Sequence, residues 1–235
     1  MMLAGDIGGT KTVLALVAKQ TDGQLLVKHE QVFASSDFAT FEDILQLFLL
    51  DKPAVSAACF GIAGPIVNQR CQTTNLPWLI DGKELQHLLG TPKVRLLNDL
   101  EAMALGMLYL DDSELIELNP QAQSQPGNIA VIAAGTGLGE AVLYWDGQRH
   151  HAMATEGGHS SFAPMNAQQD ALLAYLRPLF PAHVSYERIL SGIGFSHLYD
   201  FLLASGFAPA CPAVPAQDNP AKIDRNAVIS RLGVM

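Results

Sequence analysis

The sequence lacks the features that mark several common classes of protein. Its three cysteines, Cys59, Cys71 and Cys211, are widely spaced and form no C-x-x-C pair, so neither a disulfide framework nor a structural zinc site is indicated, and we expect buried free thiols. No apolar stretch reaches the roughly 20 residues that a membrane span needs, and no signal-peptide pattern precedes the first strand. We therefore expect a cytosolic protein without a membrane partner.

Basic residues are also scarce. The chain has 14 Lys and Arg against 23 Asp and Glu, a net charge of -9, and no Lys/Arg cluster that could lie along a nucleic-acid backbone. Nucleic acid is therefore not an expected partner. At 235 residues and 49% apolar composition, the chain is long enough for a buried core and two lobes.

Strand-like and helix-like segments alternate in the first half of the chain, which is typical of an α/β fold. Helices are predicted after three polar residues that fit an N-cap, namely Thr40, Asp81 and Asn98, and Pro53 is expected to stop the first. The predicted strands cover residues 3–6, 12–18, 25–34, 54–62 and 93–97, with a turn at 21–24 and a helix over 100–110.

A polar, turn-rich segment, 111–127, follows Leu110, and strand-like and helix-like segments alternate again after it. The sequence therefore predicts a small α/β lobe over 1–110 and a second α/β lobe over 111–235. In the second lobe we expect strands over 128–134, 139–145 and 148–154, and a loop over 205–220. We also expect helices over 166–176, 185–204 and 224–232, the second of them interrupted at Gly192 and Gly194.

Two glycine turns follow predicted strands, and both carry a threonine. They contain Asp6-Ile7-Gly8-Gly9-Thr10 and Gly135-Thr136-Gly137. Because glycine has no Cβ, a phosphate can approach the main-chain N–H groups of such a turn closely, while the hydroxyls add donors. The pair predicts a nucleotide site, whereas a single Gly-Gly turn more often only closes a hairpin.

Polar residues at a strand end offer chemistry for a hydroxyl substrate. Asn98 and Asp99 follow a predicted strand, where an amide and a carboxylate could grip a hydroxyl and accept its proton. The alternative is a simple helix N-cap, a position that favours Asp and Asn regardless of function.

Glu156 and His159 are separated by two glycines, so both side chains can face one pocket, and Glu187 adds a further acceptor for sugar hydroxyls. The alternatives are a zinc site or a polar turn. Zinc is disfavoured because no second His or Cys lies nearby at ligand spacing.

These motifs resemble those of the bacterial glucokinase family, which has the actin-like, ribonuclease H-like sugar kinase fold. They occur in the family's order over nearly the whole chain. The segments that carry the resemblance are Gly5-Asp6-Ile7-Gly8-Gly9-Thr10, Gly61-Ile62-Ala63-Gly64-Pro65-Ile66, Thr74-Asn75-Leu76-Pro77-Trp78, Asn98-Asp99, Gly135-Thr136-Gly137-Leu138-Gly139, Glu156-Gly157-Gly158-His159 and Glu187-Arg188-Ile189-Leu190-Ser191-Gly192.

The resemblance implies phosphoryl transfer from ATP to the 6-hydroxyl of glucose, with Asp99 as general base. The two glycine turns would hold the phosphates, and Asp6 would help to hold Mg²⁺ through water. The residues implied for glucose are Asn75, Asn98, Asp99, Glu156, His159 and Glu187, and those implied for the nucleotide are Asp6, Gly8, Gly9, Thr10, Gly135, Thr136 and Gly137.

The resemblance also has limits. Relatives of the ROK type carry a cysteine cluster and, in repressors, an N-terminal helix-turn-helix, and this sequence has neither. The family's C-terminal part, which forms a wall of the adenosine site, is missing, so the second lobe is expected to be incomplete. The alternative function is therefore a sugar-binding or regulatory remnant. A homodimer is possible, and the sequence separates neither glucose from similar hexoses nor ATP from other phosphoryl donors.

Overall fold

The structure is a computed structural model that describes residues 1–21, 23–73, 75–123, 125–218 and 223–233. It divides into two compact units, which are treated separately below. Unit 1 comprises Met1–Ile129 and Leu143–Ala154, and unit 2 comprises Ala130–Val142 and Thr155–Met235. The lobes 1–110 and 111–235 expected from the sequence remain a prediction.

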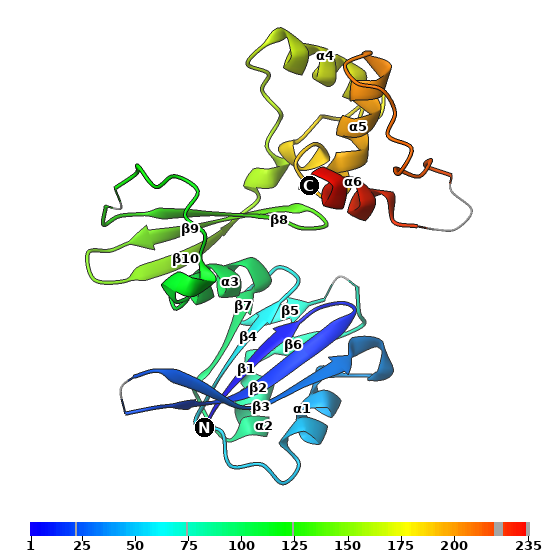
Figure 1. Ribbon diagram of the computed structural model, residues 1–235. Coiled ribbons are helices and arrows are strands. Elements are labelled where there is room, and N and C mark those ends of the chain that lie inside the picture. Colours follow the sequence, from blue (N-terminus) through cyan, green and yellow to red (C-terminus); the bar gives the residue numbers. More distant parts are fainter. Residues whose placement is uncertain (22, 74, 124, 219–222, 234–235) are drawn as a thin grey trace. The chain divides into compact units, whose positions relative to one another are not determined.

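A five-stranded sheet in the order β3-β2-β1-β4-β7 forms the centre of unit 1 (Figure 1). β1 and β2 pair antiparallel, as do β2 and β3, whereas β1, β4 and β7 run parallel. The five strands that the sequence predicted for this part of the chain are thus confirmed, although β4 begins at Ala57 rather than at Ala54. The strands are β1 (Met2–Ile7), β2 (Lys11–Lys19), β3 (Leu25–Ala34), β4 (Ala57–Ile62) and β7 (Val94–Asn98).

Two helices begin at the capping residues that the sequence indicated. The Thr40 side chain accepts a hydrogen bond from the main-chain N–H of Asp43, whose carboxylate accepts one from Thr40 N, and Asp81 accepts one from Lys83 N. Such bonds satisfy N–H groups that lack a partner inside the helix. The helices are α1 (Phe41–Leu49), which ends before Pro53, and α2 (Gly82–Leu89).

Different helices pack on the two faces of the unit 1 sheet. Leu3 and Ile7 of β1 are buried in the core that α1 also contributes to, whereas Ala4 and Asp6 alternate onto the other face and are exposed. α3 (Asp99–Met107) contacts β4 and β7, and a Cβ added to Gly61 would lie 2.9 Å from Ala102 Cβ. The face that carries Asp6 therefore also carries α3.

A short hairpin was not anticipated from the sequence. Its strands are β5 (Arg70–Gln72) and β6 (Leu79–Asp81), which are paired antiparallel. The Gln69 side chain ties this hairpin to β7, because its amide accepts from Leu96 N at 2.8 Å and donates to Leu96 O at 3.2 Å. Gln69 therefore occupies the edge of β7 just before that strand reaches Asn98.

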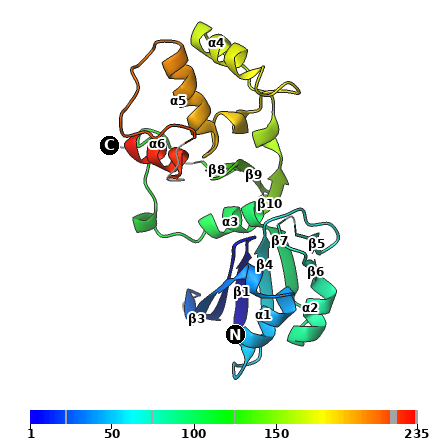
Figure 2. The same ribbon diagram turned by 90° about the vertical axis from the view of Figure 1, so that its right-hand side faces the viewer.

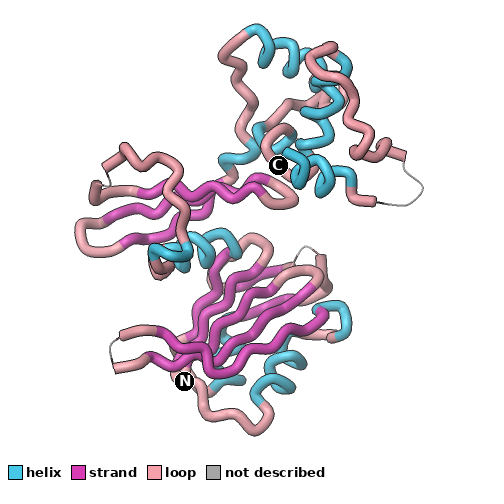
Figure 3. The backbone as a smooth tube through the Cα atoms, in the orientation of Figure 1, coloured by secondary structure: helices cyan, strands magenta, loops and turns pink. Residues whose placement is uncertain are grey.

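A second sheet has three strands in the order β10-β9-β8 (Figure 3). The three strands predicted for this part of the chain are confirmed, and Asp146 forms the turn between the last two by accepting from Gln148 N and Arg149 N. They are β8 (Ile129–Ala134), β9 (Leu138–Trp145) and β10 (His150–Thr155).

The described part of unit 2 also contains three α-helices, and α5 and α6 lie side by side (Figure 2). Its apolar core joins α4 and α5 to the segment between them. The helices are α4 (Ala167–Leu176), α5 (Gly194–Ala204) and α6 (Arg225–Gly233), and the buried core residues are Leu172, Leu176, Val184, Ile189 and Phe201.

The helix predicted over 185–204 is confirmed after its predicted interruption at Gly192 and Gly194, but the part before the interruption was wrong. Ser185 pairs with Ser161 in a β-bridge, which draws the chain away from a helical path, and only a 3-10 turn follows at Tyr186–Arg188. The α-helix starts at Gly194, whose N–H donates to Ser191 Oγ at 3.1 Å. The other 3-10 turns are Ser35–Asp37, Asp112–Glu114 and Gly157–His159.

The cysteine prediction held only in part. All three thiols are free, but only Cys71 is buried. Cys59 is exposed because it points from β4 away from the core face, and Cys211 is exposed because it lies in the loop after α5. In the described ranges no helix is long and apolar enough to cross a membrane. The predicted turn at 21–24 and loop over 205–220 include positions 22, 219 and 220, which lie outside the described residues.

Candidate active site

Hydrogen bonds from a buried serine, Ser35, hold the first glycine turn, Gly8 to Thr10. Ser35 Oγ donates to Gly8 O at 2.8 Å, and Ser35 N donates to Thr10 O at 3.1 Å. The Thr12 hydroxyl lies 3.0 Å from the same Oγ, and both side chains are fully buried. Ser35 and Thr12 thus fix the main chain of the turn. Sequence analysis did not identify them as site residues, because a serine distant in the sequence gives no periodic or spacing signal.

Two side chains of the predicted site lie next to this turn. Asp6 ends β1 just before the turn and is exposed, and it forms no ion pair with any described residue. A Cβ added to Gly9 would lie 2.8 Å from Asn75 Cβ, so the absence of a side chain at Gly9 lets Asn75 pack directly on the turn. Thr74, the residue before Asn75 in the motif, lies outside the described residues.

Asn98 is the N-cap of α3, which is the alternative to a hydroxyl-binding role that the sequence left open. Its Oδ1 accepts from Leu100 N at 3.1 Å, its Nδ2 donates to Gly64 O at 3.2 Å, and Glu101 completes a capping box by accepting from Asn98 N. These bonds hold the end of β7, the start of α3 and the Gly64 turn together. Asn98 thus has a structural role in addition to the ligand role predicted for it.

Asp99 is the first residue of α3 and is exposed. Its Oδ1 accepts from Leu100 N at 2.9 Å, which orients the carboxylate. Its Oδ2 has no hydrogen-bond partner in the described part of the chain. The geometry leaves one oriented oxygen that can accept a proton from a bound hydroxyl.

The second glycine turn belongs to unit 2 and is held by two main-chain bonds. Gly135 N donates to Gly137 O at 2.9 Å, and Gly192 N donates to Gly135 O at 2.8 Å. A Cβ on Gly192 would lie 3.0 Å from Gly135 O, so a larger residue at this position would crowd the Gly135 carbonyl. The turn and the segment before α5 are therefore packed against each other.

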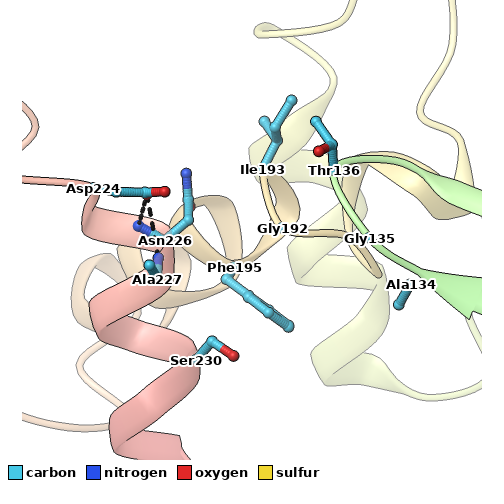
Figure 4. A pocket seen from close by; sticks show the side chains of 10 residues that line it. All are labelled: Ala134, Gly135, Thr136, Gly192, Ile193, Phe195, Asp224, Asn226, Ala227 and Ser230. Atoms are coloured by element: carbon cyan, nitrogen blue, oxygen red, sulfur yellow. Dashed lines mark hydrogen bonds between the residues drawn. The ribbon is translucent and has the colours of Figure 1, made fainter. Parts of the chain in front are cut away.

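An open pocket of about 330 Å³ lies beside this turn (Figure 4). One wall consists of the turn and of Gly192 and Ile193, and the other consists of α6, with the ring of Phe195 pointing into the space between them. The lining residues are Ala134, Gly135, Thr136, Gly192, Ile193, Phe195, Asp224, Asn226, Ala227 and Ser230.

The three polar residues proposed for sugar binding in unit 2 lie together. His159 Nε2 is 3.8 Å from Glu156 Oε2, and His159 Nδ1 is 3.7 Å from Glu187 Oε1. The other oxygen of Glu187 accepts from Leu138 N at 3.0 Å, directly after the second glycine turn. Among the described residues no group of three His, Cys, Asp or Glu side chains is arranged to hold a metal ion.

The site residues predicted from the sequence therefore form one cluster in each unit. In unit 1 they surround the first glycine turn and the start of α3, and in unit 2 they surround the second glycine turn and the Glu156-His159 pair. The unit 1 residues are Asp6, Gly8, Gly9, Thr10, Asn75, Asn98 and Asp99, and those of unit 2 are Gly135, Thr136, Gly137, Glu156, His159 and Glu187.

Comparison with known proteins gives a consistent result. A family model described as Glucokinase matches residues 3–233. Curated glucokinases of Nostoc punctiforme and Tolumonas auensis are 38% and 36% identical over 217 and 205 residues, which cover 91% and 87% of this chain. The chain spans 64% and 63% of the length of these two relatives.

Solved structures of glucokinases share the fold. The glucokinase of an Antarctic psychrotroph has a TM-score of 0.80 and 29% identity, covering 98% of this chain and 74% of its own. The Balamuthia mandrillaris glucokinase in complex with glucose has a TM-score of 0.62 and 26% identity, covering 88% of this chain and 63% of its own. The fold is that of the actin-like sugar kinases, and the chain belongs to the glucokinase family.

Proposed function

We propose that this chain carries the sugar-binding and phosphate-binding parts of a glucokinase, which transfers the terminal phosphoryl group of ATP to the 6-hydroxyl of glucose. The observation that carries the proposal is the double contact of Glu187. One of its oxygens faces His159 in the predicted sugar site, and the other holds Leu138 beside the second glycine turn. One carboxylate thus contacts both the predicted sugar-binding residues and the predicted phosphate-binding turn. This arrangement suits a reaction in which the sugar acceptor and the phosphoryl donor must be held next to each other.

In this proposal Asp99 is the general base. Its free Oδ2 accepts the proton of the 6-hydroxyl as that oxygen forms a bond to the γ-phosphorus and the bond from phosphorus to the β-phosphate oxygen breaks. Glucose 6-phosphate and ADP leave, and the proton passes from Asp99 to solvent. Asn75, Asn98, Glu156, His159 and Glu187 orient the sugar hydroxyls by hydrogen bonds.

The nucleotide phosphates would be held by main-chain N–H groups of the two glycine turns and by the hydroxyls of Thr10 and Thr136. Mg²⁺ in phosphoryl-transfer sites usually keeps several waters and takes one or two carboxylates, and the exposed, unpaired Asp6 suits such a role through water. When bound, Mg²⁺ would neutralise negative charge on the phosphates. The lining of the unit 2 pocket supports a place for the rest of the nucleotide.

Calorimetric titration of the whole chain tests the proposal. Glucose and ATP with Mg²⁺ are each expected to bind, and mannose, glucosamine, ADP and polyphosphate serve as competitors that define hexose and donor selectivity. Binding of glucose without any binding of ATP would refute the kinase proposal and leave a sugar-binding remnant. The cytosolic location and the possible homodimer expected from the sequence remain predictions.

A further inference from the structure

α6 forms a wall of the unit 2 pocket, and its apolar residues Val228, Ile229 and Leu232 are only half-buried. It has nine residues, none of which is buried. Isolated helices of this length are not stable in water, because a few hydrogen bonds do not offset the cost of ordering the first turn. The position of α6 therefore depends on the specific contacts that tie it to the rest of unit 2.

The strongest of these contacts is an ion pair between the first residue of α6 and the middle of α5. Arg225 Nη2 lies 2.5 Å from Asp200 Oδ1, and Arg225 Nη1 lies 3.1 Å from Asp200 Oδ2. The two side chains are 10% and 23% exposed, so water screens this pair only weakly. The parallel bonds fix the direction of the guanidinium as well as its position.

Arg225 has two further partners in unit 2. Its Nε donates to Pro215 O at 3.0 Å, and its Cζ lies 5.1 Å from the centre of the Tyr199 ring. α5, the loop after it and the start of α6 are thus joined through one side chain. A lysine, with a single ammonium group, could not make all of these contacts.

Asn226, the next residue, caps α5 from outside. Its Oδ1 accepts from Ser196 N at 3.1 Å and from Ser196 Oγ at 2.6 Å. The residue at the N-cap position of α5, Ile193, supplies no side-chain hydrogen bond, so Asn226 supplies the missing acceptor. Its Nδ2 has no partner among the described residues, and Asn226 lines the pocket.

Arg225 and Asp200 themselves are absent from the pocket lining, whereas Asp224, Asn226, Ala227 and Ser230 are part of it. We propose that the Asp200–Arg225 ion pair is a positioning device that holds α6 as the nucleoside-side wall of the nucleotide pocket, opposite Gly135 and Thr136. The inference rests on the proposed function. The exposed carboxylate of Asp224 places negative charge on this wall, which suits the uncharged ribose and base better than a phosphate.

The inference is tested by measuring two affinities of the whole chain separately, one for ATP with Mg²⁺ and one for glucose. Arg225→Met removes the charge but keeps most of the stem, and it is expected to weaken ATP binding about tenfold or more, as a misplaced wall would. Glucose affinity is expected to stay within about twofold, because none of the sugar residues of unit 2 lines the pocket that α6 borders. Arg225→Lys and Asp200→Asn, which keep part of the contact, are expected to lie between wild type and Arg225→Met.

Arg231→Met is the matched control, because Arg231 is exposed on the same helix and lies outside the pocket lining. It should change neither affinity. Equal losses of ATP and glucose affinity in Arg225→Met and Asp200→Asn would mean that the pair only stabilises the fold, and unchanged ATP affinity would also overturn the inference. If wild-type protein bound glucose but no ATP, the proposed function would fail first, and this inference would fail with it.

Discussion

Glu187 Oε2 accepts a hydrogen bond from Leu138 N at 3.0 Å, while its Oε1 lies 3.7 Å from His159 Nδ1. One carboxylate therefore contacts both the end of the phosphate turn and the sugar cluster. A Cβ on Gly137 would lie 2.5 Å from Glu187 Oε2, so the absence of a side chain at Gly137 makes this contact possible.

Glu187→Gln and Glu187→Ala should separate the two contacts. The amide oxygen of glutamine can still accept from Leu138 N, so ATP affinity should stay near wild type, whereas glucose affinity should fall about 10- to 100-fold with loss of a charged acceptor. Alanine leaves Leu138 N without its acceptor, so ATP affinity should fall as well. Calorimetry measures both, and equal ATP affinities for the two variants would contradict the double role.

Gly135 offers a test of phosphate contact that is independent of folding. A Cβ at this position would meet no atom within 4 Å, and the residue has no left-handed backbone. Gly135→Ala should therefore fold with an unchanged melting temperature, yet weaken ATP binding about tenfold, which corresponds to about 1.4 kcal/mol. Gly127→Ala, equally open, serves as the control. Unchanged ATP affinity in Gly135→Ala would argue against a phosphate at this turn.

Ser35→Ala should loosen the first glycine turn. It removes the hydroxyl that donates to Gly8 O and contacts Thr12, which leaves buried polar groups unpaired at a cost of about 1–3 kcal/mol. We expect a lower unfolding midpoint in urea and a larger loss of affinity for ATP than for glucose. Ser36→Ala, at the exposed neighbouring position, should behave as wild type. A variant with reduced stability but unchanged ATP affinity would separate Ser35 from the site.

Glu42, in the first turn of α1, should make stability depend on pH. Burial raises the pKa of Glu42, a main-chain hydrogen bond opposes this, and the nearby Glu84 and Asp43 carboxylates raise the pKa further. Its Oε1 is also buried without a hydrogen-bond partner among the described residues.

Because the folded pKa lies above the unfolded value, ionisation of Glu42 destabilises the fold as the pH rises through the interval between the two. Glu42→Gln should therefore melt at a higher temperature than wild type near about pH 8, and the difference should vanish near about pH 4, where the unfolded carboxyl also binds a proton. Glu30→Gln, at an exposed site, is the control. A difference that persists at the lower pH would contradict the account.

Local signals predicted much of the fold. Alternation over residues 25–34 and the Thr40-Asp43 cap act between near neighbours, so β3 and α1 could be read from the sequence. The β5–β6 hairpin could not be predicted, because strands of three residues are too short to show alternation. The false helix over 185–193 reflects long-range pairing with Ser161, which overrode local propensity.

The candidate site divides in the same way. Its glycine turns and its carboxylates lie in short motifs, and these were identified from the sequence. The residues that hold those motifs in place were not, since Ser35 meets Gly8 across 27 positions and Arg225 meets Asp200 across 25. Only the folded chain brings such partners together.

The most direct test of the central claim is the rate of ADP release by the whole chain with ATP and Mg²⁺, with and without glucose, beside Asp99→Asn. The account predicts release that requires glucose and falls at least ~100-fold in Asp99→Asn, while calorimetry shows that both ligands still bind the variant. Wild-type chain that binds both ligands but releases no ADP, or a variant as fast as wild type, would contradict it.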